Sequence, residues 1–284
     1  MGERRAVFAL TAVAMLALAA NSLLCRLALQ RDAIDPASFG AIRLVSGAVA
    51  LAVLVRLRAG RSAGCSAGQA GSWLAAAMLF AYVACFSVAY RSLAAGAGAL
   101  ILFGAVQLTM FAAGLRQGER FAARAWLGLG VAVAGLAFLL LPGASAPPAQ
   151  GALLMALAGV AWGVYSLRGR GVADPLAATA ANFLRAAPLG ILLCLPFLAG
   201  LHATVEGVLL ALASGALTSG AGYAIWYTAL RGLNALQAAT VQLSVPPLAA
   251  FGGVLLLAEP VTPRLVLASV AILGGIALVL TRRK

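Results

Sequence analysis

The segment Leu108–Glu119, with the sequence LTMFAAGLRQGE, is followed 140 residues later by Leu248–Glu259, with the sequence LAAFGGVLLLAE. The two segments have Leu, Phe, Leu and Glu at matching positions, and the match extends without a gap from residues 89–141 to residues 229–281. Fourteen of these 53 positions are identical, and they include charged residues and glycine as well as the common alanine and leucine. The repeat predicts that the chain is built from two related halves.

The composition is that of a membrane protein. Of the 284 residues, 63% are hydrophobic and only 10% are charged, whereas a soluble domain carries about 25% charged residues. This excludes a soluble globular enzyme, a disordered chain and a disulfide-rich secreted module. The formal net charge of +13 would also suit nucleic-acid binding, but such proteins gather their cations in a patch or stripe, and here the cations separate apolar runs. We therefore expect no nucleic-acid partner.

Long stretches with few charges predict ten membrane-spanning helices, because a helix needs about 20 apolar residues to cross a hydrocarbon core of about 30 Å. One charge-free run of 43 residues is divided by prolines and a glycine at residues 142–148 and supplies two of the spans. The expected fold is therefore an all-α integral membrane protein. The predicted spans are Ala6–Cys25, Pro36–Arg56, Ala70–Tyr90, Ser92–Leu115, two within Ala125–Leu167, Pro175–Leu198, Gly207–Leu230, Gly232–Ala258 and Leu265–Thr281.

Each half of the chain, residues 1–144 and residues 145–284, contains five of these spans, so the second half enters the membrane in the opposite direction. Inverted repeats of this kind are typical of secondary transporters with a substrate site near the midplane. Placing the N-terminus in the cytoplasm puts 14 cations in cytoplasmic segments and 4 outside, as the positive-inside rule requires. We expect both termini in the cytoplasm and the chain in the bacterial inner (plasma) membrane.

The first span also has the form of a cleavable signal peptide, with Arg4 and Arg5 ahead of an apolar stretch that ends in small residues. The apolar character continues to Cys25, and cleavage would leave an asymmetric set of nine spans. We expect the first helix to be retained.

The run LSVPPLAAFGGVLLLAE at Leu243–Glu259 places Pro246 in the ninth span and Glu259 at its end, and Gly275 follows in the last span. The sixth span contains Trp162-Gly163. In these features the chain resembles the EamA-type branch of the drug/metabolite transporter superfamily, and the resemblance extends over essentially its whole length.

The first half is similar to the same family at Arg43, at Gly118-Glu119-Arg120 and at Gly135, but Val106-Gln107 stands where a proline is usual. It also departs from the family's Trp-Gly pair, since Ala19-Ala20 precedes Asn21. The resemblance implies a ten-helix exporter of small metabolites, and exporters of neutral and aromatic amino acids are its closest fit. An exporter of another metabolite or drug is one alternative. A membrane channel or a non-transporting receptor or scaffold is another.

Two adjacent prolines, Pro246 and Pro247, lie in the predicted ninth span and remove two backbone donors. We expect a kink that acts as a gate or hinge, with Gln242 and Ser244 close enough to bind substrate. A kink that serves only packing is the alternative, since proline is frequent in membrane helices.

Arg43 and Arg185 lie inside predicted spans, where a charge at the bilayer centre costs about 2.5–3.5 kcal/mol on insertion scales. Asn182 lies on the same helix face as Arg185. We expect one of the arginines to bind a substrate carboxylate. Structural pairing with backbone carbonyls is the alternative.

Further aromatic and amide side chains lie on spans expected to line the centre of the bundle. They would form an amphipathic cavity suited to a zwitterion with an apolar side chain, although an interfacial belt or helix packing would use the same residue types. These substrate-binding candidates are Asn21, Tyr82, Gln107, Trp162, Tyr165 and Tyr223.

The seven Asp and Glu residues all lie in predicted tails, loops or span ends, which disfavours a cationic substrate. The only histidine, His202, lies in a predicted loop, so no nucleophile and base come together and we expect no enzyme. The chain has no GxxxxGK[ST] phosphate loop and no CxxC spacing. We therefore expect no cofactor and no metal, and a monomer or homodimer whose partners are a small-molecule substrate and the lipid bilayer.

Overall fold

The computed structural model describes residues 2–59, 71–118, 121–143, 146–169, 172–230 and 241–280. Within these ranges every regular element is a helix. The main helices are α1 (Gly2–Gln30), α2 (Pro36–Ala59), α3 (Trp73–Tyr90), α4 (Ala95–Arg116), α5 (Ala123–Leu140), α6 (Ala149–Arg168), α7 (Pro175–Cys194), α8 (Val205–Leu212), α9 (Gly222–Leu230), α11 (Val245–Leu257) and α12 (Pro263–Leu280). A 3₁₀ segment, Leu195–Gly200, follows α7, and a π-helical segment, Ala213–Ala221, joins α8 to α9.

Nine helices in the described part of the chain are long and apolar enough to cross a membrane. One of them is the continuous helix formed by α8, the π-helical segment and the start of α9. The predicted span Gly232–Ala258 lies partly outside the described residues, and its described part ends in the shorter helix α11. The predicted division of the 43-residue apolar run is confirmed, since α5 ends at Leu140 and α6 begins at Ala149. The described residues thus form an all-helical membrane fold of nine or ten spans.

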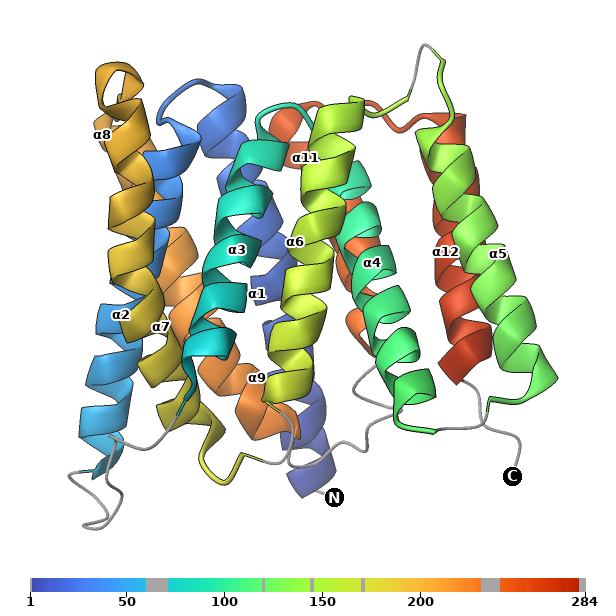
Figure 1. Ribbon diagram of the computed structural model, residues 1–284, viewed down its shortest axis with the longest axis horizontal. Helices are drawn as coiled ribbons and strands as arrows, with labels where there is room; N and C mark the ends of the chain where they lie inside the picture. The colour runs from blue at the N-terminus through green and yellow to red at the C-terminus, as the bar shows by residue number, and fades with distance from the viewer. Residues whose placement is uncertain are drawn as a thin grey trace.

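The helices stand side by side, with α5 and α12 together at one edge and α2, α7 and α8 at the other (Figure 1). The start of α1 and the end of α12 lie at the same end of the bundle, which is the lower end in Figure 1. We use "lower end" for that end and "upper end" for the opposite one, which carries the connection from α1 to α2. Helix α1 runs through the middle of the bundle and packs against α9, α11 and the π-helical segment.

Matching aspartates begin α2 and α7, one in each half of the chain. Asp35 Oδ1 accepts hydrogen bonds from the backbone N–H groups of Ala37 and Ser38, both at 2.9 Å, and Asp174 Oδ1 accepts one from Ala177 at 3.2 Å. Each aspartate is followed by a proline, which needs no hydrogen-bond partner at the first helical position. In each shared Asp-Pro pair, the aspartate is therefore the N-cap and the proline is the first residue of the helix.

Close contact between glycines holds α5 against α12. A Cβ atom added to Gly128 would lie 2.5 Å from the carbonyl oxygen of Gly275, and one added to Gly275 would lie 2.5 Å from the carbonyl oxygen of Gly128. Gly135 is similarly close to Ala271, at 2.7 Å. Small residues let the backbones of membrane helices approach, so these positions need glycine.

Candidate substrate-binding site

Arg43 on α2 is fully buried, with none of its surface exposed. Its Nε donates a hydrogen bond to Ser219 Oγ at 3.2 Å, and its Nη2 donates one to Tyr82 Oη at 3.1 Å. Its Nη1 has no hydrogen-bond partner in the described part of the chain. The guanidinium carbon also lies 5.1 Å from the ring centre of Tyr82 and 5.0 Å from that of Phe86, within the range of cation–π attraction. Arg43 is thus a buried cation with one donor group that no described residue uses.

Asn21 on α1 lies next to the same hydroxyl group. Its Nδ2 donates to Tyr82 Oη at 3.3 Å, while its Oδ1 accepts from Ser214 Oγ at 2.7 Å and from Thr218 Oγ1 at 3.3 Å. Asn21, Ser214 and Thr218 are all buried. These bonds tie α1 to α3 and to the π-helical segment in the interior of the bundle.

The π-helical segment supplies the hydroxyl groups of this site. Ser214, Thr218 and Ser219 all lie within its nine residues, and their hydroxyls contact Asn21 or Arg43. The segment packs closely on α2, since a Cβ atom on Gly215 would clash with the carbonyl oxygen of Arg43. Single π-turns inside α-helices frequently occur at functional sites. These three residues were not predicted from the sequence.

A series of aromatic rings extends from Tyr82, which lies beside Arg43. The ring centre of Tyr82 lies 4.9 Å from that of Trp162 on α6, and Trp162 lies 5.3 Å from Tyr223 and 5.5 Å from Tyr165. Phe183 on α7 extends the group, with its ring centre 6.1 Å from that of Tyr223. Such tilted and edge-on contacts at 4.5–7 Å are favourable for aromatic pairs.

We call this assembly the central cluster. It brings together six of the residues proposed from the sequence with five others that the sequence analysis did not single out. Its members are Asn21, Arg43, Tyr82, Trp162, Tyr165 and Tyr223, together with Phe86, Phe183, Ser214, Thr218 and Ser219.

Asn182 and Arg185 contact the start of α3. Asn182 Oδ1 accepts a hydrogen bond from the backbone N–H of Ser72 at 3.0 Å, and the guanidinium of Arg185 lies 5.9 Å from the ring centre of Trp73. Gly71, just before α3, lies directly beside these two side chains. A Cβ atom added to it would lie 2.6 Å from Asn182 Oδ1 and 2.7 Å from Arg185 Nη1. The two residues therefore hold the entry to α3 in place.

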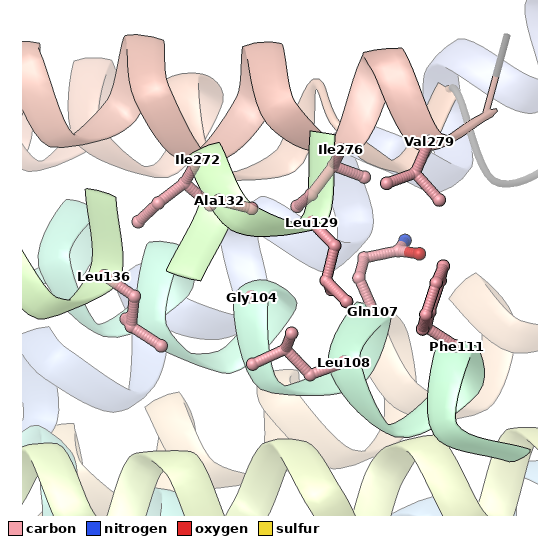
Figure 2. A pocket seen from close by; sticks show the side chains of 10 residues that line it. All are labelled: Gly104, Gln107, Leu108, Phe111, Leu129, Ala132, Leu136, Ile272, Ile276 and Val279. Atoms are coloured by element: carbon pink, nitrogen blue, oxygen red, sulfur yellow. The ribbon is translucent and has the colours of Figure 1, made fainter. Parts of the chain in front are cut away.

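Gln107 lies in a separate apolar pocket between α4, α5 and α12. Figure 2 shows its amide next to Phe111 and Val279, with Leu129 beside it. Gln107 and the other residues of this pocket make none of the contacts that define the central cluster. The residues that line the pocket are Gly104, Gln107, Leu108, Phe111, Leu129, Ala132, Leu136, Ile272, Ile276 and Val279.

The adjacent prolines lie at a helix start. The helix is interrupted by a turn at residues 243–244, and α11 begins at Val245 with Pro246 and Pro247 in its first turn. Pro246 is buried and Pro247 is exposed. Ser244 is exposed and donates its hydroxyl to the carbonyl oxygen of Val241 at 2.7 Å, while Gln242 is half-buried.

A buried ion pair joins α1, α4 and the end of α11 at the upper end. Arg26 Nε donates to Glu259 Oε1 at 2.9 Å, and only 14% and 9% of the two side chains are exposed. Glu259 Oε2 accepts from the backbone N–H of Ala95 at 2.8 Å, at the start of α4. Arg26 Nη1 also donates to the carbonyl oxygens of Tyr90 and Arg91. This network fastens three helices to one another.

A second set of contacts joins the α1–α2 connection to the segment before α8. Thr204 donates both its backbone N–H and its hydroxyl to the carbonyl oxygen of Ala33, at 2.8 and 2.9 Å. The backbone N–H of His202 donates to Asp35 Oδ2 at 3.1 Å, and Asp35 returns a backbone hydrogen bond to His202 at 3.0 Å. At the upper end, the α1–α2 connection and the segment before α8 are thus joined by side-chain and backbone hydrogen bonds.

Five of the seven carboxylates have described side chains, and each is bound at an end of the bundle. Glu259 pairs with Arg26, Glu206 with Arg31, and Asp174 with Arg58. Asp32 lies 3.2 Å from the imidazole of His202, and Asp35 caps α2. In the ranges that the structure describes, no ion pair involves Arg43, and no group of three or more His, Cys, Asp or Glu side chains could hold a metal ion.

Comparison with known proteins relates this fold to transporters. Residues 149–281 match the EamA-like transporter family, which lies within the drug/metabolite transporter superfamily. An uncharacterized protein of Pseudomonas aeruginosa is 57% identical over 283 residues, covering 100% of this chain and 97% of its own. A solved structure whose title reads "Crystal structure of protein" superposes with a TM-score of 0.68 at 21% identity, over 97% of each chain, and so shares the fold. The chain is a multi-pass membrane protein whose second half, residues 149–281, matches the EamA-like transporter family.

Proposed function

We propose that the chain is a secondary transporter that exports small carboxylate-bearing metabolites across the bacterial inner membrane. Neutral and aromatic amino acids are the members of this class that the sequence favours. One observation carries the proposal. Arg43 is a buried cation inside an apolar bundle, with one donor group that meets no partner among the described residues and with aromatic rings beside it. An ionisable residue inside a membrane bundle is costly and commonly marks a substrate pathway.

In this proposal the substrate carboxylate binds Arg43, and Tyr82, Trp162 and Tyr223 contact the rest of the molecule. The unused Nη1 donates to one carboxylate oxygen, and a hydrogen bond between two charged groups is stronger than one between neutral groups. Because Arg43 is withdrawn from water, the bound carboxylate offsets the cost of burying its charge. Substrate binding would therefore stabilise the arrangement around Arg43.

Transport would occur by alternating access, with residues 1–144 and 145–284 as inverted repeats that rock about the central cluster. The described conformation has its upper end fastened by Arg26 and Glu259, so the lower end is the side from which substrate would enter. In this scheme the lower end is cytoplasmic, as the positive-inside rule indicates. The interruption before α11, with Pro246 and Pro247 in the next turn, would serve as the hinge.

Flux through purified protein in liposomes tests the transport function. We expect uptake of radiolabelled carboxylates, with L-phenylalanine as one of the panel, to saturate with concentration, because a carrier has a finite number of binding sites. Flux that rises linearly without saturation would indicate a channel. If no carboxylate in the panel, amino acids included, crosses the membrane faster than in protein-free liposomes, the proposal is wrong.

A further inference from the structure

The hydrogen-bonding positions left at Arg43 and Tyr82 in the described chain are donors. Arg43 Nη1 has no partner in the described chain, and guanidinium nitrogens can only donate. Tyr82 Oη already accepts from Arg43 and from Asn21, so a phenol with two donors bound to it has only its own O–H left to offer. Both groups are suited to bind an anion.

The carbonyl oxygen of Asn21 is also occupied. It accepts from the Ser214 hydroxyl at 2.7 Å. The Thr218 hydroxyl has one proton to donate, and it lies 2.7 Å from the carbonyl oxygen of Ser214 and 3.3 Å from Asn21 Oδ1. An ammonium group has three N–H donors and needs acceptors, so it would have to compete with these hydroxyl donors for the same oxygens.

The charges of the site lead to the same conclusion. Arg43 contributes one buried positive charge, and the five described carboxylates lie at the ends of the bundle in contacts of their own. A bound monoanion would make the site neutral. A bound zwitterion would leave a net charge of +1 in the site, because its carboxylate neutralises Arg43 while its ammonium group stays buried without a counter-charge, and an unpaired buried charge is unfavourable in a medium of low dielectric constant.

The aromatic side chains of the central cluster favour a substrate that carries an aromatic ring. Trp162 is in ring contact with Tyr82, Tyr165 and Tyr223, so a planar ring whose carboxylate lies at Arg43 would meet other rings at the favourable distances of aromatic pairs.

We propose that the central cluster binds small aromatic monocarboxylates that carry no ammonium group, and binds them more tightly than the corresponding zwitterionic amino acids. This inference rests on the proposed transport of carboxylates and narrows it to net-anionic substrates.

Three compounds with a similar skeleton test the inference: 3-phenylpropanoate, L-phenylalanine and 2-phenylethylamine. Calorimetric titration of the purified full-length chain gives each dissociation constant. We expect 3-phenylpropanoate to bind at least tenfold more tightly than L-phenylalanine, a difference of about 1.4 kcal/mol, and the amine not to bind. Equal binding of the first two compounds, or tighter binding of L-phenylalanine, overturns the inference.

Two substitutions at Arg43 locate the binding. Arg43→Gln should weaken 3-phenylpropanoate binding at least tenfold, whereas Arg43→Lys, which keeps the charge, should bind weakly and still prefer the anion over L-phenylalanine. Arg264→Gln is the matched control, since Arg264 also has an Nη1 without a partner in the described chain but contacts Phe138, outside the cluster. Wild-type affinity in both Arg43 variants would overturn the inference.

Flux of the same compounds in liposomes separates this inference from the transport function. If 3-phenylpropanoate binds but no carboxylate is transported, the proposed transport function is wrong while the proposed anion-binding site stands. If flux is saturable but favours L-phenylalanine, the anion preference is wrong while the proposed transport function stands. Absence of binding by both carboxylates contradicts the anion site.

Discussion

Arg43 on α2 and Tyr82 on α3 are joined by a hydrogen bond of 3.1 Å inside the bundle. The same Tyr82 hydroxyl accepts a second hydrogen bond from Asn21 on α1, so one oxygen atom connects three helices. Because Arg43 is fully buried, this oxygen compensates part of the hydration that the guanidinium loses. Tyr82 is therefore both a structural joint and the residue that orients Arg43.

Replacing Tyr82 with phenylalanine should weaken both stability and substrate binding. Tyr82→Phe keeps the ring contact with Trp162 but leaves two buried donors without their acceptor, and each unsatisfied group costs about 1–3 kcal/mol. We expect a lower thermal unfolding midpoint and a higher KM for flux. The control is Ser269→Ala, because the Ser269 hydroxyl bonds only its own helix, at Leu265. If Tyr82→Phe unfolds and transports like the wild type, the assigned role of the hydroxyl is wrong.

Substitution of the contact glycines should loosen α5 from α12. Gly128→Ala and Gly275→Ala each place a methyl group 2.5 Å from a backbone oxygen of the facing helix, and overpacking of this kind costs about 1–3 kcal/mol. Gly130→Ala and Gly274→Ala on the same two helices meet nothing within 4 Å. We expect the thermal unfolding midpoint to fall in Gly128→Ala and Gly275→Ala, and to stay the same or rise in Gly130→Ala and Gly274→Ala. Equal shifts in all four variants would refute the close approach.

Loss of charge at Glu259 should open the upper end. Glu259→Gln weakens a buried, charge-assisted contact with Arg26, worth about 1.5–3 kcal/mol. The readout is modification by a thiol reagent of Cys25, which is buried next to Arg26, with the other three cysteines replaced by serine. We expect faster modification and a lower unfolding midpoint.

The control for that experiment is Glu206→Gln. Glu206 pairs with Arg31, but 52% and 56% of the two side chains are exposed, and exposed pairs contribute about 0–1 kcal/mol. If Glu206→Gln exposes Cys25 as much as Glu259→Gln does, the Arg26–Glu259 pair does not hold the upper end closed.

Asp35 should make stability depend on pH in the acid range. Burial alone would raise the pKa of its carboxyl, but hydrogen bonds from Ser38, His202 and Ala37 outweigh burial and lower the pKa from its usual value of about 3.9. A group with a lowered folded-state pKa stabilises the fold above the unfolded-state pKa, and this contribution is lost as the pH falls through the folded-state pKa. Unfolding midpoints measured from pH 6 to pH 2 should therefore fall less steeply in Asp35→Asn than in the wild type.

The control is Asp32→Asn, which removes a carboxylate that is 76% exposed and leaves the hydrogen bonds of Asp35 in place. A profile for Asp35→Asn that parallels the wild type would contradict the capping role of Asp35.

The sequence predicted the helices well because each span must contain about 20 apolar residues, and charges, prolines and glycines separate such runs. The break between α5 and α6 follows directly from the prolines near residue 142–148. The sequence did not predict the π-helical segment. The residues of a π-turn carry no distinctive sequence pattern. Whether such a turn forms depends on the helices that pack against it, which here are α2 and α1.

The central cluster was partly predictable for a related reason. Arg43, Asn21 and Trp162 are conspicuous because charged, amide and large aromatic side chains are rare inside apolar spans. Ser214, Thr218 and Ser219 gave no such signal, since a hydroxyl in a membrane helix commonly bonds its own backbone. Only the path of the chain showed that they face Asn21 and Arg43.

The predicted depth of each arginine in its helix could not show that Arg43, and not Arg185, belongs to the central cluster. Both lie inside spans, but α3 begins at Trp73, level with Arg185, and the ring of Trp73 receives that guanidinium. The level at which one helix begins beside another depends on tertiary packing, so the periodicity of the sequence carries no sign of it.

Saturable flux of a radiolabelled aromatic carboxylate, compared between the wild type, Arg43→Gln and Arg264→Gln, tests most directly whether Arg43 binds the transported substrate. We expect Arg43→Gln to raise KM at least tenfold, about 1.4 kcal/mol, while the folded protein is recovered and Arg264→Gln transports with the wild-type KM. Wild-type KM in Arg43→Gln, or an equal rise in both variants, would contradict it.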